Sequence, residues 1–264
     1  MQIALELSDG RIYYNRKITV YKSSHKKGNL KPFPRVHLMR FSAKCTFINR
    51  NMLYRIILTM IVSLHVIYAS AQGGWKLIAN KDQIKIYSQA VPESKIKAIK
   101  VDCVVDASLS QMVALLLDVE AGTQWVYKTK SCTLVKKVTP SDLYYHSEIS
   151  LPWPLDNRDF VAHLRTTQDP VTKVVTVDGP VVSGMVPLKQ NVVRVSNSKG
   201  RWVLTPLPGK VRIEYTLHTD PGGYIPAWAV NAFAAEGPME TFKSMKQQLK
   251  LPKYRNASLT FIAN

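Results

Sequence analysis

Residues 210–251 read KVRIEYTLHTDPGGYIPAWAVNAFAAEGPMETFKSMKQQLKL, and this stretch sets the expected fold. Its first ten residues alternate apolar and polar side chains, which is the pattern of a half-buried β-strand. A Pro-Gly-Gly turn ends the strand, and Pro226 suits the first turn of a helix. Apolar residues at helical spacing continue to about Leu251, so we expect one long closing helix, kinked at Gly237-Pro238.

The chain before this stretch alternates in the same way over many short segments, separated by turn sequences such as Pro208-Gly209. A helical turn is expected at Trp75–Ala79 and a helix from the N-cap Ser108 to Leu117. The expected strands are Gln83–Gln89, Lys95–Val105, Lys130–Val138, Leu143–Ser150, Asp159–Thr167, Lys173–Asp178, Gln190–Val195 and Gly200–Pro206.

The order of these elements predicts the fold class. The later strands follow one another without helices between them, so the sheet should be antiparallel rather than built from β-α-β units. One curved antiparallel sheet wrapped around the long C-terminal helix, an α+β architecture, satisfies this order. A helix that does not fill the concave face leaves an interior space lined by apolar and aromatic side chains. Such a space is the default ligand site.

The charge of the chain is unevenly distributed. The net charge is +18, yet residues 1–51 alone hold 11 Lys/Arg against two Asp/Glu. The remaining excess is spread over many segments, with no basic block interleaved with aromatic residues. This distribution disfavours nucleic-acid binding and favours transient contact with an anionic membrane surface.

Residues 52–71 have the three parts of a secretory signal peptide: Met52 with a basic residue, an apolar run over 56–68, and Ala-Ser-Ala at 69–71. We expect a periplasmic or secreted protein, with an uncleaved membrane-anchoring signal as the alternative. Because such signals stand at N-termini, we hypothesise that translation starts at Met52 and that the basic extension 1–51 is not translated. The folded domain should span 75–251, followed by a C-terminal tail at 252–264.

The three cysteines, Cys45, Cys103 and Cys132, form no Cys-x-x-Cys pair, and no histidine lies at metal-ligand spacing from them. No metal or cofactor is therefore expected. Cys103 and Cys132 fall in strands, where buried apolar thiols are the favoured interpretation and a disulfide between them is the alternative.

Four motifs suggest a family. They are LPWPLDNRDFV at 151–161, GMVP at 184–187 with NVVR at 191–194, GRWVLTP at 200–206 and DPGGYIPAW at 220–228. In their order and spacing they resemble the START domain, the steroidogenic-acute-regulatory-related lipid-transfer module, and this resemblance implies the helix-grip fold, an α+β fold. The resemblance is to a secreted member of bacterial type and covers essentially all of the chain after the signal.

The resemblance implies a tunnel between sheet and closing helix that takes one sterol, phospholipid or similar lipid. Glu148 matches a buried acidic residue that faces this cavity in the family. Its usual arginine partner would fall near Leu164, so we expect Glu148 to lack a cation. A buried carboxyl without a cation shifts towards its neutral form and can donate a hydrogen bond to a ligand.

The remaining candidate site residues come from the closing helix and the Arg-Asp motif. Those expected to line the ligand cavity, besides Glu148, are Trp228, Phe233, Met239 and Phe242. Arg158 and Asp159 are expected to fix a loop, with contact to a lipid headgroup as the alternative. His146, His163 and Glu148 form the one candidate acid-base set, and histidines without a catalytic role are the favoured interpretation.

The sequence therefore predicts a monomeric, non-enzymatic protein that binds one lipid and transfers or senses it. Two other functions stay open. One is a polyketide cyclase or isomerase on the same fold, and the other is a protein-interaction module with a vestigial cavity.

Overall fold

The computed structural model describes residues 4–8, 11–15, 54–55, 74–92, 94–232 and 234–264. The chain divides into two compact units, 1–57 and 58–264. In the first unit, β1 (Ala4–Ser8) pairs antiparallel with β2 (Arg11–Asn15). Most of the expected signal peptide at 52–71, and the candidate Phe233, lie outside the described residues.

The second unit is built on one large sheet with the strand order β3-β4-β5-β12-β11-β9-β8-β7-β6. Its strands are β3 (Lys76–Lys81), β4 (Ile84–Gln89), β5 (Ala98–Val105), β6 (Thr129–Thr139), β7 (Asp142–Ile149), β8 (Asn157–Gln168), β9 (Val175–Val182), β11 (Asn197–Leu207) and β12 (Lys210–Asp220). All neighbours along this path pair antiparallel, as expected. The short β10 (Val192–Arg194) departs from the expectation, because it pairs parallel with the first residues of β8.

The described helices lie on one side of the sheet and at its ends. They are α2 (Leu109–Leu117), the 3₁₀ turn η1 (Val119–Ala121), α3 (Gly122–Trp125), α4 (Ala227–Ala232), α5 (Glu236–Gln248) and α6 (Pro252–Arg255). The expected cap of α2 is present: Gln111 N–H donates to Ser108 Oγ, and Ser108 N–H donates to Gln111 Oε1. This reciprocal pair satisfies two backbone donors of the first turn.

Two expectations about local structure are wrong. The closing helix is not continuous but consists of α4 and α5, and Gly237-Pro238 falls in the first turn of α5 instead of kinking its middle. Proline is tolerated there because the first-turn N–H groups have no partner within the helix. Residues 76–81 form strand β3 instead of a helical turn, because pairing with β4 supplies their backbone hydrogen bonds.

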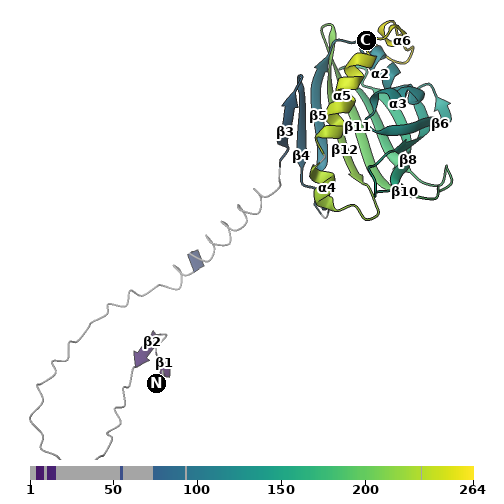
Figure 1. Cartoon of the computed structure of the whole chain (residues 1–264). Coiled ribbons are helices and arrows are strands. Elements are labelled where there is room, and N and C mark those ends of the chain that lie inside the picture. Colours follow the sequence, from purple (N-terminus) through teal and green to yellow (C-terminus); the bar gives the residue numbers. More distant parts are fainter. Residues whose placement is uncertain (1–3, 9–10, 16–53, 56–73, 93, 233) are drawn as a thin grey trace, which may run out of the picture. The chain divides into compact units, whose positions relative to one another are not determined.

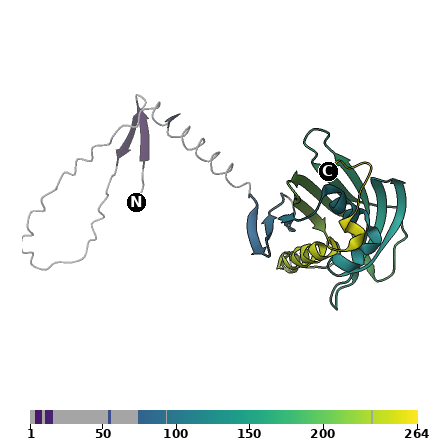
Figure 2. The ribbon, with the colours of Figure 1, turned by 90° about the horizontal axis from the view of Figure 1, so that it is seen from above.

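Helix α5 lies across the concave face of the sheet, with β3–β5 on one side of it and β6–β8 on the other (Figure 1 and Figure 2). Met239, Phe242 and Met245 are buried on α5 and recur at three-residue steps, so one stripe of the helix faces the sheet. The alternate residues of the strands supply the other half of the core, such as Val101 and Ile213.

The C-terminal residues 252–264 pack against the domain. The buried Tyr254 donates its hydroxyl hydrogen to Asp118 Oδ2 at 2.7 Å. Ala263 N–H donates to Gln168 Oε1 at 2.8 Å, and Ser110 N–H donates to Asn264 Oδ1 at 2.9 Å. These contacts hold the segment over one end of the sheet, at the opposite end from α4 (Figure 1).

Cys103 and Cys132 are free thiols. Burial raises the pKa of Cys103 to about 12 and that of Cys132 to about 11. The disulfide alternative is therefore excluded in this structure. Among the described residues, no helix has the length and apolar character to cross a bilayer, and no cluster of His, Cys, Asp or Glu is arranged to hold a metal ion.

Candidate functional site

Aromatic side chains from several elements meet between the sheet and α5. Trp202 of β11 stacks on Tyr215 of β12 with ring centroids 4.2 Å apart, and it stacks on Phe242 of α5 at 5.4 Å. Trp125 of α3 meets Trp202 edge-on at 6.4 Å. Cross-strand pairing brings Trp202 and Tyr215 together, because the two residues are directly opposite in the ladder.

Tyr145 of β7 and Tyr215 of β12 differ from ordinary core residues. Burial raises the pKa of both phenols well above their usual value, because the charged phenolate would lose its hydration. Nevertheless, both side chains are only half-buried and keep solvent-accessible surface. Neither hydroxyl has a hydrogen-bond partner among the described residues. A fully packed core would leave neither accessible surface nor unpaired hydroxyl groups.

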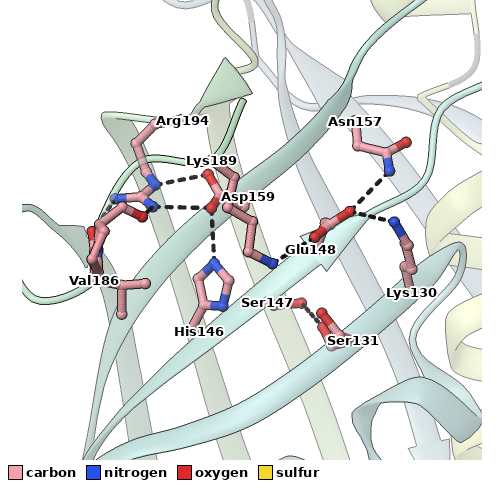
Figure 3. Close-up of polar contacts among 11 residues, drawn as sticks. Lys130, Ser131, His146, Ser147, Glu148, Asn157, Asp159, Val186, Lys189 and Arg194 are labelled. Atoms are coloured by element: carbon pink, nitrogen blue, oxygen red, sulfur yellow. Dashed lines mark hydrogen bonds and ion pairs between the residues drawn. The ribbon is translucent and has the colours of Figure 1, made fainter. Parts of the chain in front are cut away.

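Glu148 lies on the other face of β7, because side chains alternate along a strand and Tyr145 takes the concave face. Its carboxylate accepts hydrogen bonds from Lys130 Nζ at 2.9 Å, Lys189 Nζ at 2.8 Å and Asn157 Nδ2 at 2.9 Å (Figure 3). These donors, above all Lys189, lower the pKa of Glu148 to about 2.

The expectation of a neutral Glu148 without a cation is therefore wrong. Neither cation lies near Leu164, where the resemblance placed an arginine. Lys130 lies on the neighbouring strand β6, and Lys189 lies in the β9–β10 loop, 41 residues away in the chain. The structure thus places Glu148 in a charged network and does not bring it together with Phe242.

Asp159 of β8 fixes the β9–β10 loop on that same outer face. Arg194 donates to both carboxylate oxygens, at 2.7 and 3.0 Å, and also to the carbonyls of Val186 and Pro187 (Figure 3). His146 Nε2 lies 2.8 Å from Asp159 Oδ2. Burial opposes ionisation, but the hydrogen bonds from Arg194 and His146 hold the pKa of Asp159 below its usual range.

Arg158 points the opposite way and fixes the β12–α4 loop. Its guanidinium donates to the carbonyls of Pro221 at 3.3 Å and Gly222 at 3.1 Å, and to that of Asp156. Gly223 adopts φ +64°, and a Cβ there would lie 3.0 Å from Arg158 Nη2, so both conformation and space require glycine. The Arg-Asp dipeptide therefore holds one loop on each face of β8.

The other candidates lie in different surroundings. Met239 and Phe242 are buried on α5, whereas the Trp228 side chain on α4 is 73% exposed. His163 stacks on Tyr144 and lies 2.7 Å from Asp142, on the outer face of the sheet. Sequence reasoning did not single out Tyr145 and Tyr215 as site residues. Strand alternation, which puts both in phase with core residues, is the signal that could have found them.

Large apolar side chains project from three loops at the end of the sheet where α4 lies. Trp153 in the β7–β8 loop is 92% exposed, Leu188 in the β9–β10 loop is 76% exposed, and Tyr224 in the β12–α4 loop is fully exposed. Together with Trp228 they form what we term the apolar rim. Its four members surround the end of the sheet at which α4 lies, and Lys189 stands directly beside Leu188.

A comparison with known protein families matches residues 67–255 to the START domain. The chain belongs to the START domain family. An uncharacterised protein of Pseudomonas aeruginosa is 31% identical over 65% of this chain and 85% of its own length. The bovine phosphatidylcholine transfer protein is 26% identical over 67% of this chain and 84% of its own length.

A solved structure carries the same START fold. The STAR-related lipid transfer protein of Xanthomonas axonopodis is 31% identical, with a TM-score of 0.64 over 67% of this chain and 99% of that one. In the START domain described here, the acid-base candidates His146, His163 and Glu148 lie on the outer face of the sheet. They are therefore separated from the aromatic interior by the sheet itself.

Proposed function

We propose that this START domain binds one lipid between the concave face of its sheet and α5, and that it carries or senses this lipid without covalent chemistry. The observation that carries the proposal is the pair Tyr145 and Tyr215. Burial raises the pKa of both phenols, yet their side chains on the concave face are only half-buried and their hydroxyls have no hydrogen-bond partner among the described residues. Accessible surface on a core-facing side supports an interior space, which the surrounding apolar side chains make suitable for a lipid.

Lipid exchange needs little net driving force. Burying about 20 apolar carbons at about 0.8 kcal/mol each gives roughly 16 kcal/mol of gross transfer free energy. A lipid in a bilayer already has most of this stabilisation, so exchange between bilayer and protein is nearly balanced. Opening of the rim then sets the rate. The separate helix α4 and the β12–α4 loop anchored by Arg158 are the elements we expect to open.

We also propose that the apolar rim touches the membrane during exchange. Exposed tryptophan and tyrosine side chains favour the interface between water and lipid, and lysines favour anionic headgroups. The exposed aromatic side chains of the rim are Trp153, Tyr224 and Trp228, and the lysine next to Leu188 of the rim is Lys189. A lipid leaving the bilayer at this end would enter beside α4.

An enzymatic function finds less support. A cyclase or isomerase needs an acid or base in contact with its substrate. The candidate histidines contact Asp159 and Asp142, and Glu148 pairs with Lys189, all on the outer face of the sheet. A vestigial cavity would leave the Tyr145 and Tyr215 hydroxyls without a partner. Lipid binding gives them one.

Native mass spectrometry of the protein purified from its own cells tests the proposal. We expect one intact lipid per chain, identified by organic extraction, on a monomer whose mass corresponds to a start at Gln72 after export. A chain that carries no lipid and takes none from vesicles would overturn the binding proposal. A mass that retains Met1 would overturn only the hypothesis that translation starts at Met52 and that the signal is removed.

A further inference from the structure

We propose that the Tyr145 and Tyr215 hydroxyls form a hydrogen-bonding site inside the domain that selects an uncharged lipid through one of its oxygen atoms. The oxygen belongs to a hydroxyl, ketone or ester group. This inference rests on the proposed lipid binding and specifies the class of lipid. It concerns residues on the concave face only and is independent of the Arg158-Asp159 motif at the rim.

The two phenols come from distant strands and lie on the same face of the sheet. Three strands, β11, β9 and β8, separate β12 from β7 in the sheet order, and both tyrosine side chains pack against the core on the concave face. Tyr215 is also among the groups that raise the pKa of Tyr145. We therefore expect a ligand held between the sheet and α5 to reach both hydroxyls.

Ring contacts hold each phenol in place and leave its hydroxyl for a ligand. The Tyr145 ring meets Phe160 edge-on at 5.8 Å, and the Tyr215 ring stacks on Trp202 at 4.2 Å. A tyrosine hydroxyl donates one hydrogen bond and accepts others, and it usually finds a partner when it is buried. Neither hydroxyl has one among the described residues. A ligand oxygen would supply the missing partner.

The same face carries few charges for an ionic headgroup. Residues that alternate onto the concave face of β7, β8, β11 and β12 are uncharged except Arg158, whose three guanidinium nitrogens each donate to a backbone carbonyl of a loop. Glu148, Asp159 and Lys189 lie on the other face of the sheet. An ammonium group on the concave face of these strands would be buried without a counter-charge, which is costly, and a phosphate would find only Arg158, which already holds the loop.

The rival chemistry is capture of a zwitterionic choline headgroup on the aromatic rings, since such rings attract quaternary ammonium ions. The unpaired hydroxyls favour the uncharged oxygen, because the rings are already packed against one another. The phosphate that accompanies the ammonium would find Arg158 as the one cation on the concave face of β7, β8, β11 and β12, and the guanidinium of Arg158 already holds the β12–α4 loop. Uptake of phosphatidylcholine is therefore an outcome that the experiment must be able to register.

The experiment incubates the 72–264 protein with phosphatidylcholine vesicles that contain two matched pairs of lipids in equal amounts. The pairs are cholesterol with cholest-5-ene, and octadecan-1-ol with octadecane. After re-isolation of the protein, gas chromatography and mass spectrometry give the ratio of oxygenated to deoxygenated lipid bound. The wild type is compared with Tyr145→Phe, Tyr215→Phe and the double variant. Tyr144→Phe, on the outer face of the same strand, is the matched control.

We expect the double variant to lower the bound ratio about tenfold relative to wild type, because a hydrogen bond made inside the domain is lost on one member of each pair only. Tyr144→Phe should leave the ratio unchanged. The ratio of oxygenated to deoxygenated lipid does not depend on the amount of folded protein. A thermal melt checks that each variant is folded. An unchanged ratio in the double variant, or bound phosphatidylcholine with neither matched pair, overturns this inference alone. Binding of no lipid at all overturns the proposed function.

Discussion

Arg158 and Asp159 are neighbours in the chain that act on opposite faces of β8, because successive side chains of a strand point in opposite directions. Arg158 holds the β12–α4 loop, and Asp159 holds the β9–β10 loop through Arg194. The motif thus connects the two loops that border the entrance we propose. Glu148, one strand away, adds Lys189 of the same β9–β10 loop to this network.

The charge state of Glu148 gives a prediction at this scale. Its pKa in the folded protein is about 2, below the ordinary value of 4.5, so its ion pairs add stability above about pH 4.5. This stability is lost as the pH falls towards about 2. In urea unfolding between pH 6 and 2.5, the wild type should lose more unfolding free energy than Glu148→Gln.

The comparison has a matched control in Glu240→Gln, whose partner Lys243 lies one turn along the exposed side of α5. We expect this variant to follow the wild type. Added salt should shrink the effect at Glu148, because both lysines are about half exposed. An identical pH dependence in Glu148→Gln and wild type would contradict the assigned ion pairs.

At the scale of elements, the closing segment is divided into two helices that differ in burial: α5 packs against the sheet, and α4 is more exposed. Helix α5 buries Phe242 completely against Trp202 and Tyr215. Helix α4 carries the exposed Trp228 and is tied to the β4–β5 loop by Asn231, which accepts from Lys97 N–H and donates to Lys95 O. We infer that α5 is the stable part and α4 the part that can move.

Two substitutions of large apolar residues by alanine test this division. Phe242→Ala should cost about 3–5 kcal/mol of unfolding free energy, because it removes a fully buried aromatic ring and leaves a cavity. Trp228→Ala should change stability by no more than about 0.5 kcal/mol, as is usual for an exposed side chain. Urea unfolding of both variants measures the difference. Equal costs would show that α4 is as tightly packed as α5.

At the scale of the whole START domain, the two ends of the sheet differ in character. The C-terminal segment closes one end through contacts such as Tyr254 with Asp118. The other end carries α4, the anchored loops and the apolar rim. Because the C-terminal segment covers the other end, we expect the lipid that we propose to bind near α5 to reach a bilayer through the rim.

Membrane contact through the rim is the prediction for this scale. The double variant Trp153→Ala with Trp228→Ala should bind vesicles of phosphatidylcholine and phosphatidylserine about tenfold more weakly than wild type, with its melting temperature unchanged. The control is Val171→Ala with Leu207→Ala, two exposed apolar residues at the other end of the sheet, one in the β8–β9 turn and the other at the end of β11. Equal vesicle binding by the two double variants, measured by sedimentation, would argue against the rim.

Sequence alone determined the properties that depend on neighbouring residues. Alternation predicted the strands of the antiparallel sheet, the Ser108 cap began α2 where expected, and the apolar spacing of the closing segment marked Phe242 as facing the sheet. Each of these features depends on residues two to four positions apart, so the local sequence is enough to predict it.

Tertiary structure alone decided which groups meet. Lys189 reaches Glu148 from 41 residues away, β10 pairs parallel with β8, and Tyr145 and Tyr215 pack on the same concave face from strands that are not neighbours. The motif resemblance predicted a Glu148 without a cation, whereas the folded loop supplied one. Contacts of this kind depend on how loops close and how the sheet bends. Both are set by the packing of the whole domain, and no local pattern in the sequence encodes them.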